Sequence, residues 1–232
     1  NVLDDLSNSG VETFPNVFPT IFRESNGLIT KKGRIYPLGT ISNSTTILQN
    51  ESGYFPIVET DEHGFNNPKG LYEINKVDIV LTGDSYTEGY SVHSNETISA
   101  VLRKSGFNAI SVGKGGNGPL IELAALKEYA EPLKPKIVLW LYFVYDIGNL
   151  NWLSEMQSSI EVQSSILRKY LNEDDYSQNL ITRQEEIDDV LIKYVQSEWE
   201  KVRIEKGRKL KKLRIINLLK LTKLRKMVNI TP

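Results

Sequence analysis

Residues 77–85 read Val-Asp-Ile-Val-Leu-Thr-Gly-Asp-Ser, a short apolar run that ends in a glycine turn. A run of this length bounded by a turn signal is typical of a buried strand in a parallel sheet. Similar runs follow at 109–112 and 136–143, and helical patterns at 95–104 and 120–130 separate the three. This alternation predicts an α/β fold with right-handed crossovers and a parallel sheet of about three strands.

The predicted helices carry terminal signals. Asn95 is a residue type that caps helices, so we expect it at the start of the first helix. Pro119 occupies the place of a first helical residue in the second helix, after a glycine loop at 113–118.

The flanking regions differ from this core. Residues 1–75 are rich in Gly and Pro, with β-prone pieces at 17–22, 45–48 and 54–59, which predicts a β-rich N-terminal extension. Residues 76–150 form the first half of the α/β domain. Residues 151–232 carry helical spacing, with a break expected near Gly207, and predict a helical insertion or cap.

The net charge of −1 conceals an asymmetry. Residues 1–200 hold 16 Lys and Arg against 28 Asp and Glu, whereas residues 201–232 hold 12 against one. The basic end predicts a surface helix, and it also fits an anionic membrane surface. It lacks the interleaved aromatic residues that favour base stacking, so no nucleic-acid partner is expected.

Composition excludes several classes of protein. There is no cysteine, which excludes disulfides and thiolate metal sites. No apolar run approaches the roughly 20 residues of a membrane-spanning helix. Asp61, Glu62 and His63 are adjacent, so their side chains diverge, and we expect a polar turn and neither metal nor cofactor.

The clearest chemical signal is Gly83-Asp84-Ser85, which follows the first predicted strand. Open α/β sheets bind ligands at the carboxyl ends of their strands, and a serine there can present its hydroxyl to a substrate. The stretch from Val77 to Tyr90 resembles the first block of the SGNH, or GDSL, hydrolases, a flavodoxin-like family of esterases, lipases and carbohydrate deacetylases. The resemblance covers roughly residues 61–150.

The resemblance implies specific roles. Ser85 matches the nucleophile, and Gly116 matches the glycine whose amide helps to hold the oxyanion. The family's third block supplies an oxyanion asparagine; here the gap-free alignment places Tyr145 or Asp146 at that position, and Asn149 lies close by. A tyrosine hydroxyl donates to an oxyanion, whereas an acid repels it.

The family's last block, Asp-x-x-His, supplies the general base and has no match here. His63 precedes the first strand, and a helix from Ser85 to His93 would separate that pair by about 12 Å, too far for proton transfer. Because the chain starts at Asn1 and shows about three strands, we expect a fragment that stops before its catalytic histidine.

A rival pattern overlaps the glycine loop. Residues 113–118 fit G-x-G-x-x-G between a strand and a helix, as in dinucleotide-binding proteins, and Lys114 would attract phosphate. The acidic residue expected about twenty positions later is matched only by Glu131 at a helix end, and the pattern lies on the second strand–helix unit. Nucleotide binding is therefore the weaker hypothesis.

The leading hypothesis is a serine-dependent ester hydrolase or acyl transferase acting on an O-acylated carbohydrate or lipid. The resemblance also favours an extracytoplasmic or membrane-associated location. The alternative is a non-catalytic module that binds a carbohydrate or acyl group in the same pocket, which the altered third block and the missing histidine favour.

Overall fold

The computed structural model describes residues 13–51, 53–142 and 161–227. The chain forms two compact units, 1–191 and 192–232. The N-terminal elements are β1 (Thr13–Pro15), the 3-10 helix η1 (Pro19–Phe22), β2 (Leu28–Thr30), β3 (Gly33–Ile35), β4 (Thr45–Ile47) and β5 (Ile57–Glu59). Then come β6 (Ile79–Gly83), α2 (Ser85–Glu88), α3 (Ile98–Lys104), β7 (Ala109–Ser111), α4 (Pro119–Ala125), the π-helix η2 (Leu126–Ala130), the 3-10 helix η3 (Glu131–Leu133) and β8 (Ile137–Leu141). The last elements are α6 (Ser165–Asn172), the 3-10 helix η4 (Leu180–Thr182) and α7 (Gln184–Met227).

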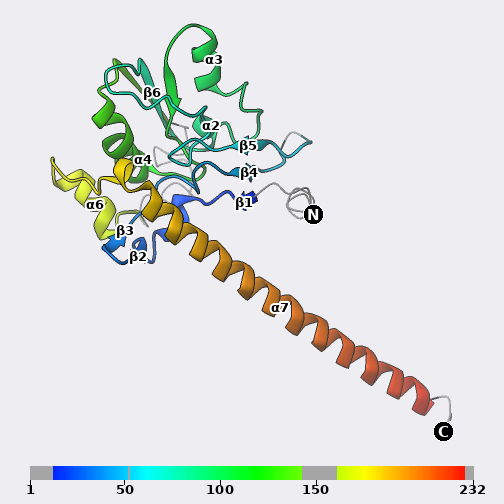
Figure 1. The fold of residues 1–232 in the computed structure, drawn as a ribbon. Helices are drawn as coiled ribbons and strands as arrows, with labels where there is room; N and C mark the ends of the chain where they lie inside the picture. Colours follow the sequence, from blue (N-terminus) through cyan, green and yellow to red (C-terminus); the bar gives the residue numbers. More distant parts are fainter. Residues whose placement is uncertain (1–12, 52, 143–160, 228–232) are drawn as a thin grey trace. The chain divides into compact units, whose positions relative to one another are not determined.

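Strands β6, β7 and β8 form a parallel sheet in the order β7-β6-β8, with β6 at the centre (Figure 1). The register pairs Ile79 with Ala109 on one side and with Ile137 on the other. The predicted α/β class and the parallel sheet are therefore confirmed.

Alternate residues of β6 face opposite sides of the sheet. Ile79 and Leu81 form a buried cluster with Ala109, against which Leu102 of α3 packs. On the next register position, the Thr82 hydroxyl donates to the carbonyl of Glu122 in α4, at 3.2 Å. Helices α3 and α4 thus cover the two faces of the sheet, and the carboxyl ends of its strands remain at one edge (Figure 1).

The structure corrects one helix start and confirms another. Thr97, not Asn95, caps α3, because the Thr97 hydroxyl accepts the N–H of Ala100 at 3.1 Å. Pro119 is the first residue of α4, as predicted, where its missing N–H leaves no intrahelical bond unmade.

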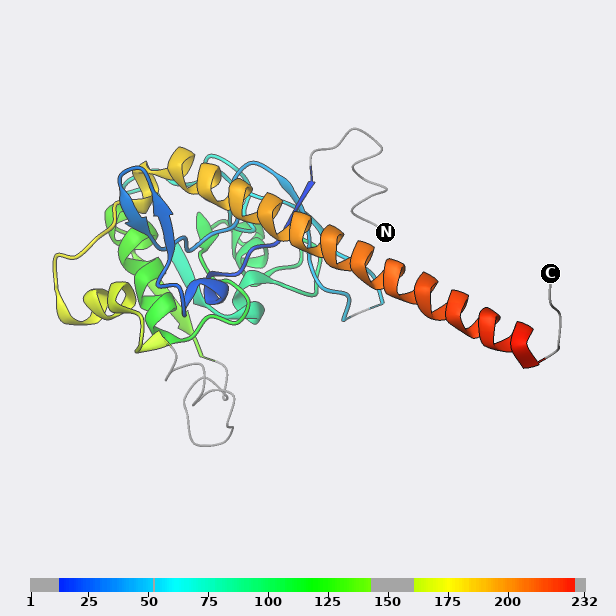
Figure 2. The ribbon, with the colours of Figure 1, turned by 90° about the horizontal axis from the view of Figure 1, so that it is seen from below.

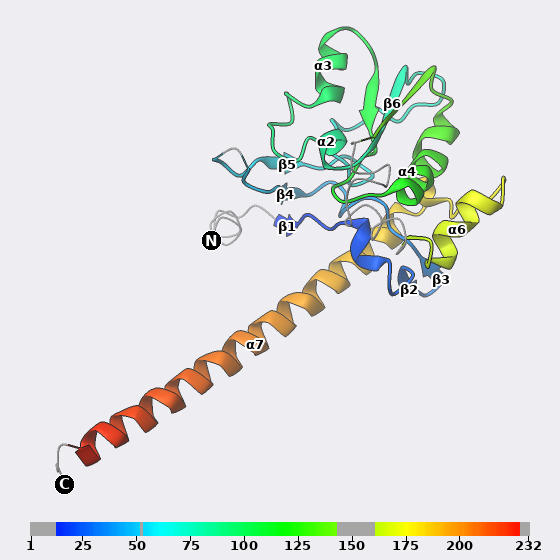
Figure 3. The same cartoon turned by 180° about the vertical axis from the view of Figure 1, so that it is seen from behind.

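The N-terminal region contains the mixed sheet β1-β4-β5 and the β2–β3 hairpin, so strands at 45–47 and 57–59 are confirmed. The expected strand at 17–22 is wrong throughout, because β1 ends at Pro15 and neither Val17 nor Phe18 belongs to a strand. Pro19 begins the helix η1 there, and the carbonyl of Phe18 accepts the N–H of Ile21 at 3.2 Å. Figure 3 shows the hairpin beside α6, to which Asn26 is hydrogen-bonded through Ser164 and Ser165.

Helix α7 is continuous from Gln184 to Met227 (Figure 2). The break predicted near Gly207 is therefore wrong. One glycine costs a helix about 1 kcal/mol, and the neighbouring lysine, arginine and leucine residues favour helix. Among the described residues, no helix is both long and apolar enough to cross a membrane.

Candidate active site

The serine turn joins β6 to α2. Asp84 is the N-cap of α2, and its carboxylate accepts the N–H of Tyr86 at 2.9 Å. Burial raises the pKa of Asp84, although that hydrogen bond opposes the shift. Ser85 is the first helical residue, and Gly89 ends the helix with φ of 74°. Ser85 therefore stands at the carboxyl end of the central strand, where the sequence predicts it.

Gly83 makes this turn sterically tight. It has φ of 154°, and a Cβ added there would lie 2.2 Å from the Thr87 hydroxyl oxygen and 2.7 Å from the carbonyl oxygen of Leu141. Only glycine fits at this position, because both the backbone conformation and the space exclude a side chain.

Ser85 is half-buried and lines a cavity of about 440 Å³. The lining residues are Glu51, Ser85, Tyr86, Gly89, Tyr90, Ser91, Val92, Glu96, Thr97 and Ile98. No described residue forms a hydrogen bond with the Ser85 hydroxyl. The volume is within the range of small-molecule sites, roughly 300–1,000 Å³, so Ser85 borders space that a ligand can occupy.

The glycine loop that follows β7 lies at the same edge of the sheet. The N–H of Val112 donates to the carbonyl of Leu81 at 2.8 Å, and that of Lys114 donates to the carbonyl of Gly83 at 3.3 Å. Gly116 has φ of 72°, and its carbonyl accepts Nη2 of Arg23 at 2.7 Å. The fold therefore brings the serine turn and the glycine loop side by side.

On either side of Gly116, the backbone N–H groups of Gly115 and Gly118 donate to carboxylates. The N–H of Gly115 donates to Glu88 at 2.7 Å, and the N–H of Gly118 donates to Glu161 at 2.8 Å. The N–H of Leu120 donates to the second oxygen of Glu161 at 3.0 Å. Helix α4 thus already has a protein carboxylate at its N-terminus, the place where a dinucleotide pyrophosphate binds in the rival hypothesis.

Burial raises the pKa of Glu161, and the guanidinium of Arg23, 3.6 Å away, opposes that shift together with the loop amides. Burial likewise lowers the pKa of Arg23. These two residues come from segments 138 positions apart, and together they hold the carbonyl of Gly116 and the amide of Gly118.

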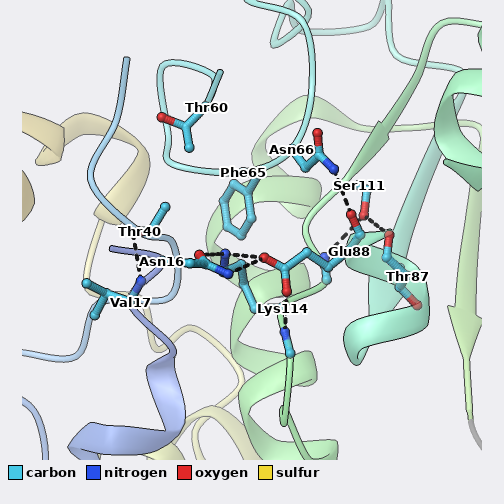
Figure 4. A network of polar contacts seen from close by, with 12 residues as sticks. Asn16, Val17, Thr40, Thr60, Phe65, Asn66, Thr87, Glu88, Ser111 and Lys114 are labelled. Carbon is cyan, nitrogen blue, oxygen red and sulfur yellow. Dashed lines mark hydrogen bonds and ion pairs between the residues drawn. The ribbon is translucent and has the colours of Figure 1, made fainter. Parts of the chain in front are cut away.

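A buried ion pair joins α2 to the glycine loop (Figure 4). Nζ of Lys114 lies 2.5 Å from Oε1 of Glu88, and both side chains are almost fully buried. Asn16 completes the group: its Nδ2 donates to Glu88 at 3.0 Å, and its Oδ1 accepts from Lys114 at 2.6 Å. The ammonium group of Lys114 is therefore already paired with Glu88 and is not positioned to bind phosphate.

Two further hydrogen bonds fix the end of α2. Nδ2 of Asn66 donates to the carbonyl of Glu88 at 3.0 Å, and the Ser111 hydroxyl donates to the carbonyl of Thr87 at 2.8 Å (Figure 4). The helix that carries Ser85 is thus tied to the turn at 61–67, to β7 and to the glycine loop.

Neither histidine contacts Ser85. His93 is exposed, its ring stacks on Tyr54 at 4.5 Å, and it is not among the residues that line the serine cavity. His63 is buried between Tyr72 and Tyr129, and its Nδ1 lies 3.4 Å from Oε1 of Gln184.

The His63 environment leads to a pH prediction. Burial lowers the pKa of His63, so on acidification the unfolded chain takes up this proton before the folded chain does. Stability from His63 is therefore present above about pH 6.5 and is lost as pH falls below that value. We expect His63→Phe, which keeps a ring between the two tyrosines, to show a flatter loss of stability than the parent between pH 7 and 5 in urea unfolding.

Asp61 changes stability with pH in the direction opposite to His63, and it is present in both the parent and the His63→Phe variant. Burial raises its pKa to about 6, against hydrogen bonds from Asn67, Phe65, His63 and Tyr72. Its contribution is lost as pH rises through about 6, so the difference between the two proteins isolates His63. Parallel pH profiles would contradict the prediction.

Tyr145, Asp146 and Asn149 lie outside the described residues. Sequence reasoning missed Glu88, Glu161, Arg23 and Asn16. Of these four residues, only Glu88 had a local signal in the sequence. It lies three positions after Ser85, and that spacing places two side chains near each other on a helix.

Among the described residues, no group of three or more His, Asp or Glu side chains is placed to hold a metal ion. The candidate site therefore consists of the serine turn, the cavity beside Ser85 and the adjacent glycine loop, although no residue of 113–118, Gly116 included, lines that cavity. No protein family model, no curated protein and no solved structure matches this chain.

Proposed function

We propose that this chain supplies the nucleophile and part of the oxyanion hole of a serine-dependent ester hydrolase or acyl transferase with a flavodoxin-like sheet. The observation that carries the proposal is the position of Ser85: the carboxyl end of a central parallel strand, a hydroxyl with no hydrogen bond to a described residue, and a cavity beside it. The order β7-β6-β8, in which the second strand precedes the first and third, supports the flavodoxin-like assignment.

In this mechanism Ser85 Oγ attacks the acyl carbon of an ester while a base takes its proton. The N–H groups of Ser85 and Gly116 hold the oxyanion, with a side-chain donor such as Asn149 from the third block. Collapse of the intermediate expels the alcohol, which receives the proton, and water or a second alcohol then takes the acyl group from Ser85. Neither histidine of the described residues contacts Ser85, so neither is placed to take this proton.

The competing function is a binding module that holds a carbohydrate or acyl group without turnover. Among residues 13–51, 53–142 and 161–227 no base is hydrogen-bonded to Ser85, which favours this function, as do the two tyrosines and two glutamates in the cavity lining. Aromatic faces and carboxylates are groups that bind sugar rings and hydroxyls.

A fluorophosphonate probe separates the two functions. We expect labelling of a longer form of the chain, complete loss with Ser85→Ala, and retention with Ser91→Ala. Ser91 is the matched control because it lines the same cavity while its hydroxyl donates to Glu51 at 2.7 Å. Absence of labelling in every form, with the protein folded, would shift the assignment to the binding module.

A further inference from the structure

A second cavity, of about 630 Å³, lies against the C-terminal half of α3 and shares no lining residue with the serine cavity. Its lining consists of Ile57, Glu59, Asn66, Asn67, Pro68, Lys69, Ser94, Asn95, Ala100, Arg103 and Lys104. The size suits a small molecule. Part of the wall is rigid, because Asn67 is buried and hydrogen-bonded to Asp61 and Ser111 at 2.8–2.9 Å.

The charge of this cavity opposes that of its surroundings. Three cations, Lys69, Arg103 and Lys104, face one carboxylate, Glu59, which already accepts the Thr45 hydroxyl at 2.5 Å. Within the described part of the chain, none of these cations forms an ion pair. Residues 1–200 carry 12 more acidic than basic residues, so this local excess of positive charge stands against a negative background.

Of the three cationic side chains, that of Arg103 is the most buried. It is half-buried, and its Nη1 donates to the carbonyl of Ala109 at 2.7 Å. Lys104 is exposed, and its Nζ donates to the carbonyl of Asn95 at 2.7 Å. Both side chains are therefore held in place by backbone carbonyls, which position their charge without neutralising it, and an anion would supply the missing countercharge.

Three residues of the lining, Ile57, Pro68 and Ala100, are apolar. Ile57 is about half exposed, at 49 %, and Ala100 is buried, while Pro68 lies beside the lysine at position 69. Burial of such surface by a ligand is favourable because it removes apolar area from water. A charged head alone would leave this surface in water.

We propose that this cavity binds an amphipathic anion, a carboxylate with a medium-length alkyl chain whose head lies near Arg103 and Lys104 and whose chain covers Ile57 and Ala100. The site is independent of Ser85 and of the ester hydrolysis proposed above. It adds a binding activity that the serine cavity, which has two glutamates and no basic residue in its lining, does not offer to an anion.

Calorimetric titration of the 232-residue chain with octanoate tests this site. We expect saturable binding that weakens as sodium chloride is added, and no comparable binding of octyltrimethylammonium, which has the same chain with the opposite charge. Lys69→Gln/Lys104→Gln removes two exposed charges and should weaken octanoate binding about tenfold, whereas Ser85→Ala should leave it unchanged.

Lys31→Gln/Lys32→Gln is the matched control, since it removes the same charge from the exposed β2–β3 turn. Equal weakening in this control would show diffuse electrostatic attraction and overturn the proposal. Equal binding of the cationic surfactant, or no saturable binding of octanoate, would also overturn it. Arg103→Gln serves as a further variant, with circular dichroism used to verify that it folds.

Discussion

Replacement of Lys114 by methionine is expected to lower the free energy of unfolding by about 3–5 kcal/mol. The substitution keeps the length of the side chain but leaves the Glu88 carboxylate buried without its countercharge, retaining only the donors from Asn16 and Gly115. Since single domains are stable by about 5–15 kcal/mol, a loss of this size brings the protein close to unfolding. Urea unfolding at pH 7, followed by circular dichroism, measures it.

Lys136→Met is the matched control. Lys136 pairs with Asp78 at 2.7 Å, but the lysine side chain is 74 % exposed. Exposed pairs contribute about 0–1 kcal/mol, so this variant should remain close to the parent. Similar losses in the two methionine variants would contradict the role assigned to the buried pair.

Glu88→Gln tests whether charge or shape dominates this pair. Glutamine retains an acceptor for the loop amide but removes the negative charge, so alone it leaves Lys114 buried and uncompensated. The double variant Glu88→Gln/Lys114→Met contains neither charge, and we expect it to be more stable than Lys114→Met. A double-mutant cycle of these variants gives the coupling energy of the pair.

The parallel sheet was predictable because its signal is local. The runs at 77–81, 109–112 and 136–143 are mostly apolar and bounded by glycine or proline, so each identifies a strand without knowledge of its neighbours. Burial is confirmed for β6 and β7, whereas the expectation of a buried third strand is wrong, because every residue of β8 is half-buried or exposed. The same locality explains two errors. Pro19 was assigned to a strand although it begins a 3-10 helix, and Gly207 was assigned to a break although a long helix tolerates one glycine.

The polar framework of the site was not predictable, because its partners are distant in sequence. Asn16 meets Glu88 across 72 positions, and Glu161 meets Gly118 across 43. A glutamate in a sequence gives no sign of whether it faces water or a glycine loop. The candidate nucleophile was accessible to sequence reasoning because a turn after a strand has a fixed place in an α/β sheet, whereas the groups that hold the turn are set by tertiary packing.

Replacement of Gly83 by alanine is the second change with a large expected effect, a loss of roughly 3–5 kcal/mol in the free energy of unfolding. The added Cβ would lie 2.7 Å from the Leu141 carbonyl oxygen, a backbone atom of β8 that cannot move without disturbing the β6–β8 pairing, and the φ of 154° adds backbone strain. Gly33→Ala separates the two causes: Gly33 has φ of 112°, but nothing lies within 4 Å of its added Cβ, so only the strain of about 1–3 kcal/mol applies. Thermal or urea unfolding of the two variants should therefore give clearly unequal losses. Equal losses would mean that conformation alone makes glycine necessary at Gly83, and that β6 and β8 can separate enough to admit a methyl group beside the serine turn.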